Sequence, residues 1–176
     1  MFKLMRPKEF KLSWREYIFL ILYTIVIAFT AVIIHETAHV LLAMALGIPF
    51  VELQPGFMWI NPSIILPEWF TSPHRTIVYY AGGLATGTVL LVLYLWHWMR
   101  QYWRNPTFFR WCLGLVTLTL VSVQFAFGYL EGHYHGAYIT GAMSLFSPAN
   151  LLVYGCAVPA VFFHLALCPW RKMRTA

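Results

Sequence analysis

The sequence predicts an all-α integral membrane protein, a single polytopic domain over residues 1–176 with about four transmembrane helices. Its 176 residues are 60% apolar and only 10% charged, and the mean hydropathy of +0.66 is far above that of a soluble domain. Four apolar stretches, at residues 17–47, 76–99, 108–130 and 151–170, are long enough to cross a hydrocarbon core of about 30 Å. We therefore expect the lipid bilayer to surround most of the chain.

The formal net charge of +6 reflects the predicted topology. Eleven of the 12 Lys and Arg residues flank the spans on one side of the membrane, and only Arg75 falls on the other. Because basic residues accumulate on the cytoplasmic side, we expect both termini and the 100–110 loop in the cytoplasm, most simply at a cell membrane. The basic charge therefore does not indicate nucleic acid as a partner. The eleven residues are Lys3, Arg6, Lys8, Lys11, Arg15, Arg100, Arg104, Arg110, Arg171, Lys172 and Arg174.

The first span carries the motif HETAH at residues 35–39, an instance of HExxH. His35 and His39 are four residues apart, so on a helix both rings project from one face and can bind the same metal ion. Glu36 lies one step around the helix, where it can act as a general base on a water at the metal. Because the apolar run continues through the motif, we predict a retained signal-anchor helix. The alternative is that three polar residues simply hydrogen-bond between helices.

The connection between the first two spans, residues 48–75, contains five prolines, which forbid a continuous helix. It is also rich in aromatic and aliphatic residues, which is unusual for a solvated loop. We therefore predict a re-entrant or interfacial segment, or an aromatic belt anchored in the headgroups. The prolines are Pro49, Pro55, Pro62, Pro67 and Pro73.

The second and third spans each carry one further feature from which a role can be predicted. Gly83 and Gly87 form a GxxxG motif on the second span, which predicts a helix-packing face. Gln124, in the middle of the third span, is expected to bond across helices or to contact substrate.

A catalytic zinc site normally takes three protein ligands, and the third ligand is expected from the outward end of the third span. Glu131, His133 and His135 cluster there, and the chain contains no Asp. Counting residues along the spans places this cluster at a depth similar to that of HExxH, toward the extracytoplasmic side. We expect the third ligand to be Glu131, His133 or His135, and position alone does not choose among the three.

These motifs together resemble the site-2 protease family of intramembrane zinc metalloproteases. The resemblance rests on HETAH, on Ala81-Gly82-Gly83-Leu84 in the second span and on Leu130-Glu131-Gly132 at the end of the third, and it covers about residues 20–135. It implies a three-helix protease-like core over about 17–135, followed by a fourth helix at about 151–170. It also implies Zn²⁺ held by His35, His39 and Glu131, and Glu36 as the catalytic base for peptide hydrolysis in or near the bilayer.

Two departures from the family pattern keep a second class of function open. Glu131 stands where the family has Asp, and Val123 and Ala126 stand where it has an Asn and a Pro that help to hold substrate. The alternative is a non-catalytic, protease-like subunit of a larger membrane complex. The expected partner is thus either a membrane-protein substrate or a set of partner membrane subunits.

A third class, a histidine-box di-iron membrane oxidoreductase, is also consistent with His35, His39, His133 and His135. Such sites commonly use about eight histidines, however, and this chain has seven in all. The inventory therefore favours a single-metal site.

Overall fold

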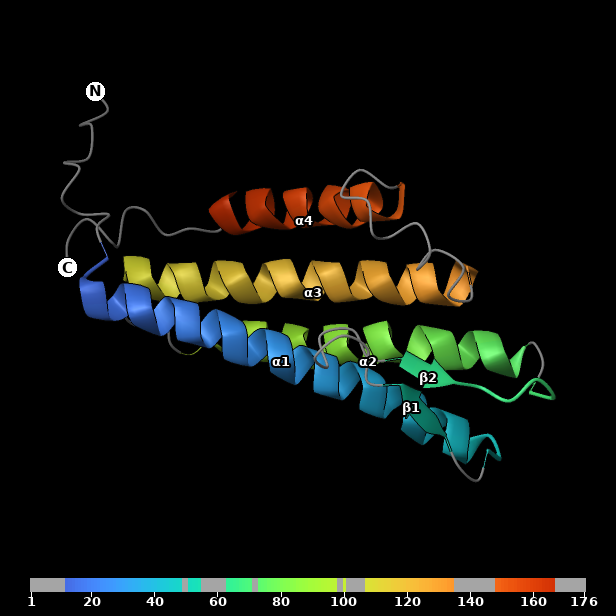
Figure 1. Cartoon of the computed structure of the whole chain (residues 1–176). Coiled ribbons are helices and arrows are strands. Elements are labelled where there is room, and N and C mark those ends of the chain that lie inside the picture. Colours follow the sequence, from blue (N-terminus) through green and yellow to red (C-terminus); the bar gives the residue numbers. More distant parts are fainter. Residues whose placement is uncertain are drawn as a thin grey trace.

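The fold, in a computed structural model, is a set of long antiparallel helices (Figure 1). The structure describes residues 12–48, 51–54, 63–70, 73–97, 100, 107–134 and 148–166. The helices of this described part are α1 (Trp14–Ala45), α2 (His74–His97), α3 (Phe108–Tyr134) and α4 (Pro148–Ala166). α1, α2 and α3 pack against one another, and α4 packs on α3 on the side away from α1 (Figure 1).

Three of these helices are long and apolar enough to cross a membrane. α1, α2 and α3 have 32, 24 and 27 residues, and their most apolar windows carry few charges. The fourth predicted span appears as α4, but its apolar part, Leu151–Ala166, is shorter, and Pro159 lies inside it. The predicted helices of the first three spans are therefore confirmed, each with the length and apolar composition that a membrane crossing needs.

The long helix α1 has a well-defined start and a single buried stripe. Ser13 caps its N-terminus in a capping box with Glu16, and the helix ends before Gly47, whose φ of +99° favours glycine. Its buried residues recur every four positions, so they form one stripe facing α2 and α3. They are Ile27, Ala31, His35, His39 and Ala43. The remaining faces of α1 are largely exposed and apolar, as expected for a helix in lipid.

Glycines allow α2 and α3 to approach closely. A Cβ on Gly83 would collide with the backbone of Gly128, and a Cβ on Gly87 would lie 2.9 Å from the ring of Phe125. Backbones can pack this tightly only where side chains are absent. The packing role predicted for Gly83 and Gly87 is confirmed.

The connection between α1 and α2 contains a short antiparallel hairpin. β1 (Glu52–Gln54) pairs with β2 (Ser63–Ile65), with Leu53 opposite Ile64. Beside the hairpin, Ile48, Leu66 and Phe70 pack with Ala43 of α1 and Val78 of α2 in one apolar cluster. Apolar residues of this connection thus cover the C-terminal end of α1 and the N-terminal end of α2.

Part of the predicted Pro-rich segment lies outside the described residues. Pro49, Pro55 and Pro62 are in that part, while Pro67 and Pro73 are described. Its re-entrant or interfacial placement stays a prediction.

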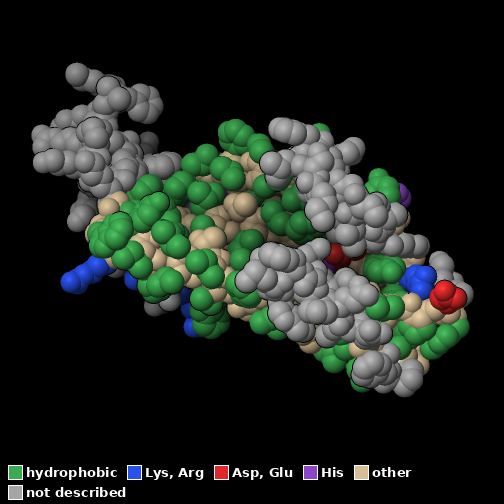
Figure 2. Space-filling view, in the orientation of Figure 1, with side chains coloured by type: hydrophobic (Ala, Val, Ile, Leu, Met, Phe, Trp, Pro, Cys, Tyr) green, Lys and Arg blue, Asp and Glu red, His purple; other side chains and the backbone are tan. Residues whose placement is uncertain are grey.

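The helix ends separate into two groups along the long axis of the molecule. The start of α1, the end of α2, the start of α3 and the end of α4 lie at one end (Figure 1). Exposed hydrophobic side chains cover the surface between the ends (Figure 2). This arrangement matches the alternation of spans that the sequence predicts.

Candidate metal centre

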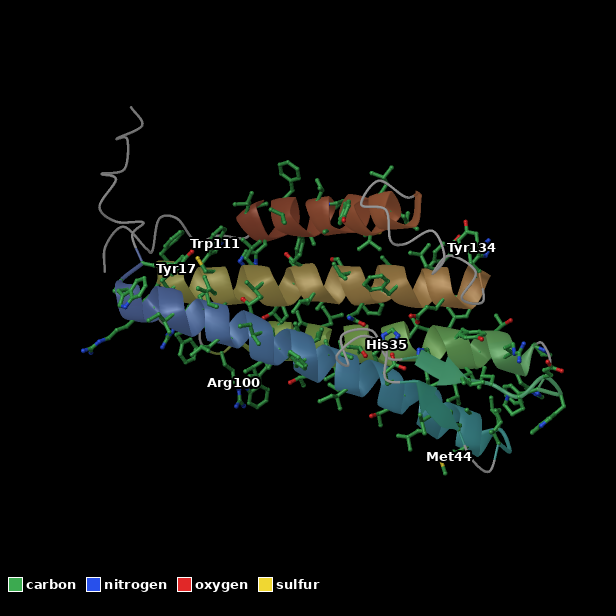
Figure 3. All side chains as sticks on the ribbon, in the orientation of Figure 1. Tyr17, His35, Met44, Arg100, Trp111 and Tyr134 are labelled. Atoms are coloured by element: carbon green, nitrogen blue, oxygen red, sulfur yellow. The ribbon has the colours of Figure 1, made fainter. Side chains whose placement is uncertain are left out.

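The two histidines of HExxH lie on the buried stripe of α1, one turn apart. His35 is 7% exposed and His39 is 4% exposed. Their ring centroids are 4.7 Å apart, and the rings are inclined at 73°. Figure 3 shows His35 pointing from α1 toward the interior of the bundle. The four-residue spacing therefore brings both rings to the contact with α2 and α3, as the sequence predicts.

Glu131, in the last turn of α3, completes the group. Its Oε2 lies 2.9 Å from His35 Nε2 and 3.4 Å from His39 Nε2. One ligand atom from each of the three residues lies within 4.8 Å of the others, so the group could hold a metal ion. Within the described residues it is the single group of this kind. We refer to His35, His39 and Glu131 as the ligand triad.

The other nitrogen of each ring has a fixed partner. His39 Nδ1 is 2.6 Å from the backbone carbonyl of Val78, and His35 Nδ1 is 2.9 Å from Gln124 Oε1. A carbonyl oxygen can only accept, so each Nδ1 carries the hydrogen and donates it. Nε2 then faces Glu131 in one of two ways: a protonated ring donates a second hydrogen to Glu131 Oε2, or a neutral ring offers its lone pair to a metal shared with the carboxylate. The cross-helix bond predicted for Gln124 is thereby confirmed.

Space for the two rings is provided by Gly82 of α2. A Cβ built on Gly82 would collide with His39 Nε2 and would lie 2.6 Å from His35 Nε2. On α3, Gly132 follows Glu131 directly, and a Cβ there would collide with the ring of Tyr80. Glycines thus shape the site on both neighbouring helices.

Glu36 lies beside the triad without belonging to it. Its side chain is partly buried, and it follows His35 directly in the chain. Glu36 Oε2 is buried without a hydrogen-bond partner among the described residues. A buried carboxylate oxygen left unpaired is costly, and such groups are often functional.

The alternate ligands proposed from the sequence lie elsewhere or outside the described part. His133 is exposed, its ring stacks on Tyr129 with centroids 5.5 Å apart, and it is not in the triad. His135 lies outside the described residues. His74 stacks on Phe70. Of the described histidines, two share the group, fewer than a di-iron histidine box uses.

The donor set fits a metal on structural grounds. Two imidazoles and one carboxylate form the combination found in some catalytic zinc sites, where a fourth position stays open. The Glu131 side chain is 18% exposed, so the triad reaches the molecular surface on its side. Figure 2 shows an acidic and a histidine side chain next to each other on this face.

Sequence reasoning did not identify two features of this site. The Val78 carbonyl has no signal in the sequence, because any backbone carbonyl could take this part. In the sequence, Gly82 stands out only as part of the run Ala81-Gly82-Gly83-Leu84 in the second span.

Comparison of the chain with protein-family models, with curated proteins and with solved structures found no match.

Proposed function

We propose that the protein is a membrane-embedded zinc metallopeptidase resembling the site-2 protease family. The observation that supports this most directly is the buried ligand triad, in which both histidines turn Nε2 toward one carboxylate. Zinc held by His35, His39 and Glu131 would activate a water molecule and polarise a peptide carbonyl. The substrate would be a membrane protein cut in or near the bilayer.

Residues of the protein would carry out proton transfer, orient the ligand rings and exclude water. Glu36 follows His35 directly, and its Oε2 has no partner among the residues that the structure describes; it takes the proton of the attacking water and returns it to the leaving amine. Gln124 and the Val78 carbonyl hold the two rings in the tautomer that ligation needs. The packing of α1 against α2 excludes bulk water from the buried face of the triad.

The proposed orientation follows from the basic residues. With both termini and the 100–110 loop in the cytoplasm, the triad lies toward the extracytoplasmic side of a cell membrane. Arg75, on the opposite side from the other basic residues, donates from Nη2 to the carbonyls of Leu66 and Pro67. Its local structural role is compatible with this orientation.

The catalytic proposal is tested with Glu36→Gln in purified protein. Cleavage of a fluorescein-labelled transmembrane peptide in detergent should fall by about 10²–10⁴-fold, because the general base is lost. Metal content, measured by plasma mass spectrometry, should stay at one zinc per chain. Glu68→Gln, which alters an exposed glutamate outside the triad, is the matched control. Equal cleavage by Glu36→Gln and the unaltered protein would refute the mechanism.

A non-catalytic subunit is the second candidate, and one packing observation favours it. Ala126 is buried in a cluster with Leu130 and with Val153 of α4, and Val123 packs against the same cluster. The two positions at which the site-2 family handles substrate thus serve the contact between α3 and α4 here. Bound zinc without cleavage, together with co-purification of other membrane subunits in fixed stoichiometry, would select this candidate.

A further inference from the structure

The depth of the ligand triad can be estimated from the start of α1. Arg15 and Glu16 lie in its first turn beside the capping serine, and charged groups of this kind mark the edge of the hydrocarbon. His35 then lies about 30 Å from Arg15 along the helix axis, at ~1.5 Å per residue. The hydrocarbon core is about 30 Å thick, and a tilt of ~20° shortens the axial distance to about 28 Å. On this measure the triad lies near the opposite boundary.

Exposed aromatic residues support the same placement. Trp14 and Tyr17 stack on each other at the start of α1, and Arg100 lies over the ring of Trp96 at the end of α2. At the other end, Tyr129 and Tyr134 flank Glu131, and each is 49% exposed. Tyr and Trp concentrate at the two membrane–water interfaces. Figure 3 shows Tyr17 and Tyr134 toward opposite ends of the bundle.

Distances along the axes of α3 and α2 give an upper and a lower estimate of the depth of the triad. Glu131 lies about 30 Å along α3 from Trp111. Gly82, which faces the histidines, lies only about 21 Å along α2 from Trp96. The triad therefore lies near the level of the exposed residues Tyr129 and Tyr134, on the side that faces the hydrocarbon core.

The length of α1 requires one of its ends to extend past the hydrocarbon. Its 32 residues span about 48 Å, more than the core thickness. The charged first turn fixes the N-terminal end at the membrane edge, so the excess lies beyond the triad. There Ala43 packs with Ile48, Leu66 and Phe70, which explains why apolar residues continue after HExxH.

We infer that the triad acts on peptide bonds at the hydrocarbon–headgroup boundary, on the side opposite the basic helix ends. The substrate class is then the juxtamembrane segment of a membrane-anchored peptide, where the chain leaves its transmembrane helix. Backbone groups freed from a helix are costly in hydrocarbon, whereas water satisfies them at the boundary. A juxtamembrane segment can thus reach the triad in extended form without unwinding a buried helix. This inference of substrate class rests on the proposed peptidase function.

The placement is tested without any activity, by attaching nitroxide labels to exposed positions of α1. Val26→Cys marks the middle of the span, Ile33→Cys lies one turn before the triad level, and Thr37→Cys lies at that level. The labels are introduced after the three native cysteines have been replaced by alanine, in a protein shown to retain its metal. Collision rates with dissolved oxygen and with a water-soluble nickel chelate are measured in lipid vesicles by electron paramagnetic resonance.

The nickel-to-oxygen collision ratio should rise several-fold from Val26 to Thr37, with Ile33 in between. Equal ratios at Val26 and Thr37 would place the triad inside the hydrocarbon and overturn the inference.

The substrate class is tested with leucine-rich transmembrane peptides that carry one helix-breaking segment at different depths. The segment is placed at the centre of the apolar stretch, at its end, or just beyond it, and products are mapped by mass spectrometry. Cleavage should be strongest when the segment lies at the end of the stretch. Preferred cleavage at the centre would overturn the inference. If Thr37 is water-accessible and no peptide is cut, the placement stands and the proposed peptidase function falls.

Discussion

The bundle buries histidines in two places, and their surroundings differ in one respect. His164 of α4 is completely buried, with Nε2 donating to the Trp111 carbonyl at 3.0 Å and Nδ1 accepting from the Tyr94 hydroxyl at 3.1 Å. His35 and His39 bond a neutral partner only through Nδ1 and turn Nε2 toward a carboxylate. Burial is therefore similar in both places, and the partner of the second nitrogen separates a histidine that joins helices from one that could bind a metal.

The largest expected effect is on metal binding, and it should divide the two places. His35→Ala or His39→Ala removes one of three ligands, so zinc should be lost on purification. His164→Ala removes contacts that join α2, α3 and α4, which should lower thermal stability while zinc stays bound. Plasma mass spectrometry and a thermal melt of each variant in detergent measure both effects. Loss of zinc from His164→Ala with the fold intact would contradict the distinction.

Gly82→Ala should weaken metal binding next most strongly. The new Cβ collides with His39 Nε2 and crowds His35, so the rings must shift from their shared carboxylate. We expect an affinity loss of about 100-fold, the upper end of the range for disruptions of ligand orientation. Gly155→Ala in α4 is the matched control, since a Cβ there meets nothing within 4 Å. Competition with a chromogenic zinc chelator gives both affinities, and equal values would show that Gly82 does not shape the site.

Gln124→Leu should reduce metal affinity by about 10–100-fold, because His35 Nδ1 loses the acceptor that fixes its tautomer. Gln124→Glu keeps an acceptor for the same hydrogen and should restore most of the affinity. ¹⁵N shifts of the histidine ring nitrogens report the tautomer directly. A helix-packing role alone would leave the His35 tautomer unchanged in Gln124→Leu.

Tyr94→Phe should have the smallest effect. It removes the hydroxyl that bonds His164 Nδ1 while leaving the ring in place, which should lower the free energy of unfolding by about 1 kcal/mol. Zinc affinity should not change. A steric-trap or denaturant titration in detergent gives the free energy, and a change in zinc affinity would link two places that the structure keeps separate.

Much of the helical framework could be predicted from the sequence because hydrophobic length is a strong signal in membrane proteins. The predicted stretch 76–99 became α2, and 108–130 became α3, extended to Tyr134. The extension matters, because it places Glu131 inside the helix instead of in a loop. An apolar-run criterion stops at a glutamate, whereas the backbone hydrogen bonds of the helix continue past it.

The sequence predicts those parts of the candidate site that depend on residue spacing within one helix. It does not predict the parts that depend on how the helices are rotated and shifted against one another. His35 and His39 share a face by the helical period alone, and comparing depths predicted the cluster that contains Glu131, while the resemblance to the site-2 protease family singled out Glu131 itself. The choice of Glu131 over His133 depends on how α3 is rotated, which places His133 on the exposed side against Tyr129. The bond from His39 to the Val78 carbonyl depends on the axial register of α1 and α2, and no residue type encodes it. The β1–β2 hairpin was missed because strands of three residues are too short to show a period.

The ligands of the triad come from helices made at very different times. His35 and Glu131 are 96 residues apart in the chain, so α1 enters the membrane with its two histidines well before the ribosome completes α3. Metal cannot be held by the full triad until α3 is inserted and packed against α1 and α2. Under the proposed function, metal uptake would therefore report the completion of membrane assembly, and a truncated or misinserted chain would lack the full ligand set.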